Sequence, residues 1–130
     1  MQFLQPPGWP RPKGHACGVA ASGRQVHVSG MVGWDAAGVF HSDDFVAQAC
    51  QALDNVVAVL REAGADPGHI VRMTRYVLDK REYLDAGPAL GEACRAVIGR
   101  HYPAMSALQV AGLMKERARV EIEVTAVVPD

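Results

Sequence analysis

The chain has 130 residues, of which 49% are hydrophobic and 21% are charged, and its formal net charge is −1. This length supports one domain with a sizeable core, and this composition is typical of a folded globular protein. The charge is near neutral and no basic block is present. These features argue against a dedicated nucleic-acid or membrane-surface protein, since both need concentrated positive charge.

The cysteines and histidines show no metal-binding pattern. Cys17, Cys50 and Cys94 lie far apart without a C-x-x-C motif, and the histidines are equally scattered. We therefore expect free thiols in a reducing cytoplasm and no metal site. The first residues contain no basic and then apolar leader, and no stretch is long enough to cross a bilayer, so we expect neither a secretory signal nor a membrane partner.

The chain begins with a proline-rich stretch, residues 1–14, which predicts an extended arm on a single domain of residues 1–130. The arm carries Trp9, and it could pack on its own core or on a neighbouring subunit. Two strands joined at Ser22-Gly23 should follow, the second over residues 25–32. The stretch "GWDAAGVF" then predicts a turn and a short return strand.

Residues 44–64 have apolar side chains at helical spacing and predict a strongly amphipathic helix. Ser42 or Asp43 would cap its start, and Gly64 would end it. A strand is expected over residues 70–79. A weaker helix over residues 83–100 follows, loosened by Gly87-Pro88 and Gly91.

Two more strands complete the chain, one after Pro103 and one over residues 118–128. The resulting β-β-α-β-α-β-β order predicts an α+β fold with two helices on one face of a sheet. In the last strand, apolar residues alternate with polar ones: Val120, Ile122, Val124 and Ala126 against Arg119, Glu121, Glu123 and Thr125. The mixed polar face has no helix left to cover it, which suggests burial against other copies of the chain.

The strand after Pro103 also has two different faces. One face carries Ala104, Ser106, Leu108 and Val110 and is expected to face the core; the other carries Met105, Ala107 and Gln109. The second set is neither clearly apolar nor clearly polar. The alternation alone therefore leaves open what Met105 faces.

Four stretches, in this order, resemble the reactive intermediate deaminase (RidA/YjgF) family, also known as L-PSP endoribonucleases: "VHVSGMVG", "QALDNVVAVLREAGADPGHIVRMTRYVLD", "YPAMSALQV" and "VEIEVTAV". The resemblance extends from about Gly14 to Val127. It implies a chorismate-mutase-like fold and a homotrimer with small clefts between subunits. Active members hydrolyse enamines and imines derived from amino acids, releasing ammonia and a 2-keto acid without a cofactor.

One position departs from the family pattern. The family uses an arginine, in the motif Pro-Ala-Arg-Ser, to bind the substrate carboxylate, and a guanidinium suits this role because it binds a carboxylate bidentately. Here Met105 stands at that position. Ala107 stands where a cysteine is often found, and His15 aligns with an aromatic residue of active members.

Two cleft residues of the family are retained, and we take them as catalytic candidates. Glu121 could serve as a general acid or base, or it could pair with a nearby arginine: Arg72, Arg75 or Arg119. Ser29 could contact ligand, although a hydroxyl at a strand end more often bonds to backbone than acts as a nucleophile. Tyr76 shares the polar face of its strand and is a further ligand-binding candidate.

The remaining candidates have equally open alternatives. Met105 is either a flexible interface filler or an apolar wall for a ligand. His15 is a titrating cleft residue or a surface donor, and Cys17 is reactive only if a cation lies near it. Arg75 is discordant among apolar neighbours; its stem could pack while its head reaches solvent, or it could be a displaced carboxylate anchor.

Three functions follow as hypotheses. The first is hydrolysis of an enamine, imine or related small metabolite that differs from the usual amino-acid-derived imines. The second is small-molecule binding without turnover, and the third, least supported by the charge, is cleavage of RNA that inhibits translation. With Met105 in place of the arginine and Glu121 retained, the cleft should be neutral or negative and should favour a neutral or cationic ligand.

Overall fold

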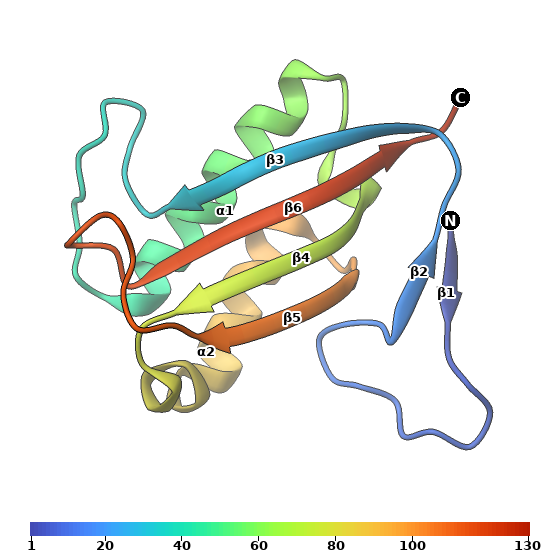
Figure 1. The fold of residues 1–130 in the computed structure, drawn as a ribbon, viewed down its shortest axis with the longest axis horizontal. Coiled ribbons are helices and arrows are strands. Elements are labelled where there is room, and N and C mark those ends of the chain that lie inside the picture. Colours follow the sequence, from blue (N-terminus) through green and yellow to red (C-terminus); the bar gives the residue numbers. More distant parts are fainter.

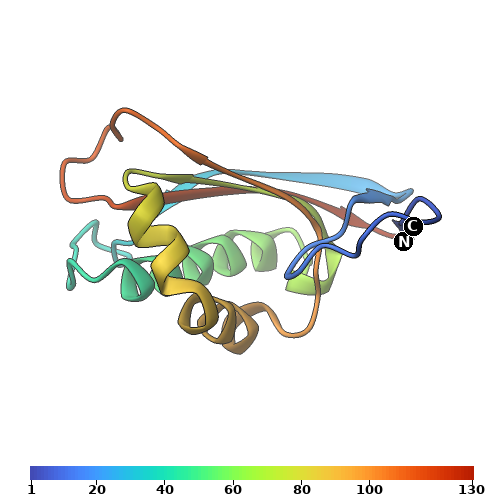
Figure 2. The same ribbon diagram turned by 90° about the horizontal axis from the view of Figure 1, so that it is seen from below.

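The computed structural model describes residues 1–130 and places a four-stranded sheet against two long helices (Figure 1). The elements are β1 (Gln2–Leu4), β2 (Gly18–Ala20), β3 (Arg24–Val32), α1 (Phe45–Glu62), the 3-10 turn η1 (Pro67–His69), β4 (Ile70–Val77), α2 (Lys80–Ile98), β5 (Ala104–Gln109) and β6 (Val120–Val128). The large sheet has the order β3-β6-β4-β5, with β5 parallel to β4. Both helices lie on one face of this sheet, and the other face is open (Figure 2). The predicted chorismate-mutase-like α+β fold is confirmed.

Helix α1 forms the centre of the core. Its apolar stripe faces the sheet because residues three and four apart share one side of a helix. Leu53, Val56 and Leu60 are fully buried there, against Ile70 of β4 and Ile122 of β6. One polar residue, the buried Gln48, shares this stripe. Its amide donates to the Ser42 and Arg117 carbonyls and accepts from the Arg119 N–H. Gln48 therefore connects α1 to the loop that precedes it and to the segment that leads into β6.

The start of α1 differs by one residue from the prediction. Asp44 is the cap, and its carboxylate accepts from the Ala47 N–H at 2.9 Å. The two residues predicted as caps have other partners: the Ser42 hydroxyl accepts from the Asp44 N–H, and Asp43 pairs with Arg117. The predicted end is confirmed, because Gly64 follows the helix in a left-handed conformation (φ 70°).

Helix α2 begins earlier than expected and is kinked. Asp79 caps it by accepting from the N–H groups of Arg81 and Glu82, a capping signal that the prediction of residues 83–100 missed. Gly87 has φ 23° and ψ −107°, so two helical segments meet there at an angle. Pro88 contributes to the break because it has no N–H to donate within the helix.

The N-terminal region differs from the prediction in its pairing. The expected hairpin across Ser22-Gly23 does not form, since β2 pairs with β1 while β3 pairs with β6. The predicted arm therefore contains a strand, and it returns to its own chain, where the Ala16 N–H donates to the Pro103 carbonyl at 3.0 Å. The expected return strand is reduced to one bridge between Trp34 and Phe40.

The register of β5 overturns one prediction about faces. Met105 pairs with the buried Met73 of β4, and Ala107 pairs with Arg75, so this set of β5 residues lies on the face covered by helices. Ser106 and Leu108, which were expected to face the core, lie on the open face. The alternation was correct, but its assignment to the two faces was reversed, because an edge strand with small residues gives no strong polarity signal.

Candidate functional site

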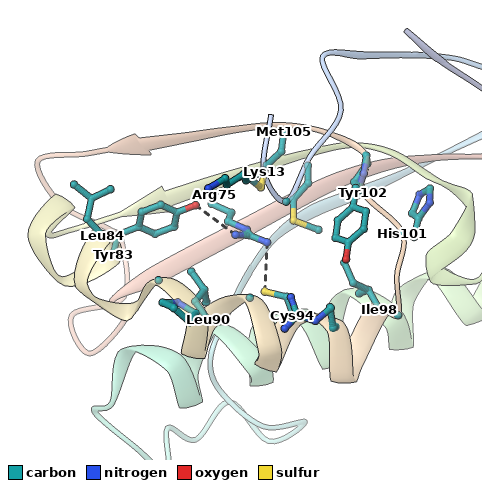
Figure 3. Close-up of a pocket in the computed structure, with 18 residues that line it drawn as sticks. Lys13, Arg75, Tyr83, Leu84, Leu90, Cys94, Ile98, His101, Tyr102 and Met105 are labelled. Atoms are coloured by element: carbon teal, nitrogen blue, oxygen red, sulfur yellow. Dashed lines mark hydrogen bonds between the residues drawn. The ribbon is translucent and has the colours of Figure 1, made fainter. Parts of the chain in front are cut away.

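A pocket of about 530 Å³ opens between α2 and the β4–β5 edge of the sheet (Figure 3). Met105 and Met73 form part of its wall on the sheet side. Apolar residues of α2 form the opposite wall: Leu84, Leu90 and Ile98. A pocket of this size, with apolar walls and few polar groups, is typical of a small-molecule site.

The kink of α2 contributes to this pocket. Gly87, Pro88 and Gly91 all line it, and none of them carries a long side chain. The left-handed φ of Gly87 is readily adopted by glycine, whereas a Cβ at this position would be strained. The same Gly-Pro signal that weakened the helix prediction therefore marks the place where α2 leaves room for a ligand.

Arg75 extends from β4 into the pocket (Figure 3). Its Nη1 donates to the Tyr83 hydroxyl and its Nη2 to the Cys94 sulfur, both at 3.4 Å. The Nε is buried and has no hydrogen-bond partner. No ion pair with a carboxylate is formed, so the guanidinium has only neutral partners. The bond to the Tyr83 hydroxyl is at the long end of hydrogen-bond distances, and the thiol sulfur of Cys94 is a weak acceptor.

The charge of the pocket lining has one sign. Lys13, Arg75 and Arg95 line it together with His101, whereas Asp and Glu are absent from the lining. The lining that one chain gives to this pocket is therefore cationic, whereas the sequence predicted a neutral or negative cleft formed by Met105 and Glu121. That prediction considered the loss of one arginine from β5 and not the cations that neighbouring elements bring to the same place.

His15 and Cys17 lie in an adjoining pocket of about 410 Å³, formed by the N-terminal segment and the chain before β5. The His15 ring contacts the Lys13 carbonyl at 3.2 Å, and the Cys17 thiol donates to the Gln5 side chain at 3.4 Å. This pocket shares Gly14, His101 and Tyr102 with the first, so the two are continuous.

The other candidates lie on the open face of the sheet. Ser29 borders a shallow hollow of about 440 Å³ with residues of β4 and β6. The Tyr76 hydroxyl donates to the Glu123 carboxylate at 2.5 Å. This hydrogen bond, together with partial burial and the negative charges of Glu123 and Glu121, raises the pKa of Tyr76 above its ordinary value.

Glu121 belongs to this open face and lies over a glycine. A Cβ built on Gly30 would come within 2.3 Å of a Glu121 carboxylate oxygen, so the absence of a side chain at Gly30 leaves room for the carboxylate. Gly30 sits at a register shift of β3 between Val28 and Met31. Glu121 pairs with none of the three arginines considered as partners, and Arg119 pairs instead with Glu82 at 2.9 Å.

The chain thus distributes the candidates over four places. Ser29, Glu121 and Tyr76 share the open face, while Met105 lines the pocket on the covered face. His15 and Cys17 lie in the adjoining pocket, and Ala107 is exposed on the edge strand. The seven candidates therefore do not converge within one chain. The sequence analysis missed Lys13 and Arg95 as pocket cations. Arg75 had a visible signal, since it occupies a position of β4 whose neighbours on the same face, Met73 and Val77, are buried.

No group of three or more His, Cys, Asp and Glu side chains lies close enough together to hold a metal ion. Neither helix is long and apolar enough to cross a membrane. The fold and pocket together define a class: small α+β domains with an apolar pocket beside an edge strand and an open sheet face.

Comparison with known proteins gives the family. A family model described as Endoribonuclease L-PSP matches residues 10–128, and the chain belongs to this family, the RidA/YjgF family. The 2-iminobutanoate/2-iminopropanoate deaminase of Capra hircus is 34% identical over 105 residues, 80% of this chain and 73% of that protein. The protein of the same name from Salmonella typhimurium is 35% identical over 105 residues, 81% of this chain and 80% of that protein.

Solved structures agree with this assignment. A Rid-family protein of unknown function, YyfB from Yersinia pestis, has a TM-score of 0.79 and 34% sequence identity, covering 98% of both chains. The YjgF gene product of E. coli has a TM-score of 0.70 and 31% identity, again covering 98% of both chains. The resemblance seen in the sequence is therefore confirmed at the level of family and fold.

Proposed function

We propose that the protein hydrolyses an imine or enamine of a small metabolite in clefts between the subunits of a homotrimer. The observation that carries this proposal is the position of Glu121: its carboxylate lies on an open sheet face, without an ion-pair partner, in a chain related to proteins named as imine deaminases. A carboxylate that no cation holds is available as a general acid or base.

The homotrimer is supported by the open face itself. No helix covers it, yet it presents Leu108, 46% exposed, beside the Tyr76 and Glu123 pair. A sheet face of mixed polarity, next to the free edge of β5, is suited to association with further copies of the chain. Assembly would also allow the open face of one subunit to meet the β5 edge of another, where the pocket opens.

In this proposal Glu121 accepts and donates protons. Water adds to the carbon of the protonated imine as the carboxylate takes one of its protons, giving a neutral carbinolamine. The carboxylic acid then returns this proton to nitrogen, and the C–N bond breaks as the carbonyl forms. The carboxylate takes the hydroxyl proton of the carbinolamine and passes it to the released ammonia, which leaves as ammonium. An enamine would first be protonated at carbon to give the imine. Water is the only co-reactant, and a positioned acid-base group contributes about 10²–10⁴-fold to such steps.

The test is hydrolysis of imines generated in the cuvette from amino acids by an amino-acid oxidase, with semicarbazide as a competing trap. The protein should lower the yield of trapped imine and raise the rate of keto-acid release above that in buffer. Glu121→Gln should release the keto acid at least about 100-fold more slowly than the wild type. Glu116→Gln, in an exposed loop, is the matched control and should keep the wild-type rate. A rate that Glu121→Gln leaves unchanged would contradict the assignment.

Binding without turnover is the second candidate, and Met105 is the observation that favours it. This side chain replaces the arginine that the family resemblance places at the substrate carboxylate. The same assay distinguishes the two functions, since a protein that only binds the imine would not raise the rate of keto-acid release. RNA cleavage is the remaining alternative; incubation of a labelled single-stranded RNA with the same preparation and with Glu121→Gln would reveal it.

A further inference from the structure

We propose that Arg75 binds the carboxylate of the ligand, so that the anchoring cation comes from β4 instead of β5. This inference deepens the proposed function by naming the class of ligand: a small carboxylate with a short apolar chain. It replaces the expectation, drawn from the sequence, of a neutral or cationic ligand. Four observations carry it, each from a different part of the pocket.

The first observation is the state of the guanidinium. A half-buried arginine normally has a carboxylate or several carbonyl partners, because an unsatisfied charged donor loses its hydration without compensation. Arg75 has a phenol and a thiol at 3.4 Å and an Nε with no partner. No carboxylate of the chain pairs with the positive charge of Arg75. The two Nη groups, held only by weak neutral partners, remain free to take a carboxylate in bidentate geometry.

The second observation is the position of Arg75 relative to Met105. In the parallel ladder, Met105 pairs with Met73 and Arg75 pairs with Ala107. Arg75 is therefore on the neighbouring strand, on the same face, and one step further along the ladder. An arginine displaced in this way reaches the same pocket, while Met105 supplies an apolar wall in place of the cation.

The third observation is the field around Arg75. Lys13, from the N-terminal segment, and Arg95, from α2, line the same pocket, and the lining lacks a carboxylate. The adjoining pocket adds Arg11 and Arg100, also without an acidic residue. In a chain of net charge −1, this concentration of positive charge favours an anion over a neutral ligand.

The fourth observation gives the rest of the ligand. Met73, Leu90 and Ile98 line the same pocket with apolar surface, so an apolar group attached to the carboxylate would leave water there. Such a pocket suits a short aliphatic chain better than a polar one. The reacting carbon would then extend toward the mouth of the pocket, near the β5 edge that a neighbouring subunit is proposed to meet.

The experiment is calorimetric titration of the full-length protein with 2-ketobutyrate and with its neutral amide. The wild-type protein should bind the acid and should bind the amide at least about 30-fold more weakly, the effect of losing a charged pair in a partly desolvated site. Arg75→Met should weaken the binding of the acid by the same factor. Arg61→Met is the matched control, since it is the same change at an exposed position near the end of α1, outside the pocket and away from the open face, and it should leave the affinity unchanged.

Arg75→Lys provides a second variant in case Arg75→Met folds poorly. It keeps the charge and loses the bidentate geometry, so it should bind the acid with intermediate affinity. Equal affinities for acid and amide, equal losses in Arg61→Met and Arg75→Met, or failure of the wild type to bind the acid would each overturn the inference. Imine turnover is a separate readout: binding through Arg75 without turnover would overturn only the proposed function, and turnover unaffected by Arg75→Met would overturn only this inference.

Discussion

The two faces of the large sheet differ both in what covers them and in the charge that they carry. The covered face packs under α1 and α2 and opens at the β5 end into a pocket lined by Lys13, Arg75 and Arg95 without a carboxylate. The open face has no helix and carries Glu121 and Glu123 together with Arg72. In a chain of net charge −1, cations without carboxylates thus gather in a pocket on one face, while the carboxylates of β6 lie on the other.

This separation is the reason that the proposed site needs residues from two chains. Side chains on opposite faces of a strand point away from each other, so Glu121 and Arg75 of one subunit cannot hold the same small molecule. The open face of a second subunit, set against the β5 edge of the first, would bring a carboxylate to the mouth of a cationic pocket. The ligand would meet an anchoring cation from one chain and an acid-base group from the other.

The largest expected effect concerns the covered face, which should carry the stability of the fold. Leu53 is completely buried between α1 and the sheet, and Leu53→Ala should lower the free energy of unfolding by about 2–5 kcal/mol. Val59, on the outer side of the same helix, is the control: Val59→Ala should change it by less than about 0.5 kcal/mol. Urea unfolding followed by circular dichroism measures both, and similar losses would contradict the contrast.

The next effect concerns the open face, which should carry the assembly. Leu108→Glu places a further carboxylate on a face that already carries Glu121 and Glu123, and burial of this unpaired charge should weaken association by at least about 30-fold. Val59→Glu adds the same charge on the outer side of α1 and should leave the assembly intact. Sedimentation equilibrium should report a trimer for the wild type and the control, and smaller species for Leu108→Glu. A trimer in all three would place the interface elsewhere.

The same contrast shows what the sequence could predict. The periodicity of residues 44–64 and the alternation in β6 were sufficient for α1, the buried face of the sheet and the α+β class, since each depends on local patterns with many apolar residues. The four motifs were sufficient for the family. Both conclusions rest on many residues acting together, so no single unusual position could overturn them.

The pocket could not be predicted in the same way, because it depends on register and on contacts distant in sequence. Assigning the faces of β5 required the Met73–Met105 pairing, which no pattern within β5 specifies. Lys13 and Arg95 come from a loop and a kinked helix whose placement depends on the whole fold. Arg75 was visible as an exception in its strand, but its interpretation required knowing that β4 is interior and that α2 covers it.

A smaller effect tests how Glu121 is positioned. Gly30→Ala would place a methyl group where the Glu121 carboxylate lies, so the side chain must move by a rotamer change. We expect at least about a 10-fold loss of imine turnover with unchanged unfolding midpoint, since a shift of about 1 Å in a catalytic group is costly. Gly112→Ala is the matched control, because a Cβ at Gly112 meets no atom within 4 Å. Equal turnover in both variants would mean that Glu121 does not act from this position.

The smallest effect is a titration on the open face. Deprotonation of Tyr76 places a phenolate against the Glu123 carboxylate, and the lost hydrogen bond is the first reason that the pKa of Tyr76 is raised. In a background of Tyr83→Phe and Tyr102→Phe, tyrosinate absorbance should therefore report a pKa above the ordinary value of about 10. Glu123→Gln should lower this pKa because the charge is removed, while Glu116→Gln should not.

The raised pKa of Tyr76 also makes the stability of the fold depend on pH. The folded state holds the Tyr76 proton more tightly than the unfolded chain does, so this contribution is complete below about pH 10, the unfolded pKa, and is lost as pH rises through the folded pKa. Wild-type protein should lose stability in that alkaline range more steeply than Glu123→Gln does, as measured by urea unfolding at successive pH values. Parallel curves would show that the Tyr76–Glu123 hydrogen bond does not contribute to stability in solution.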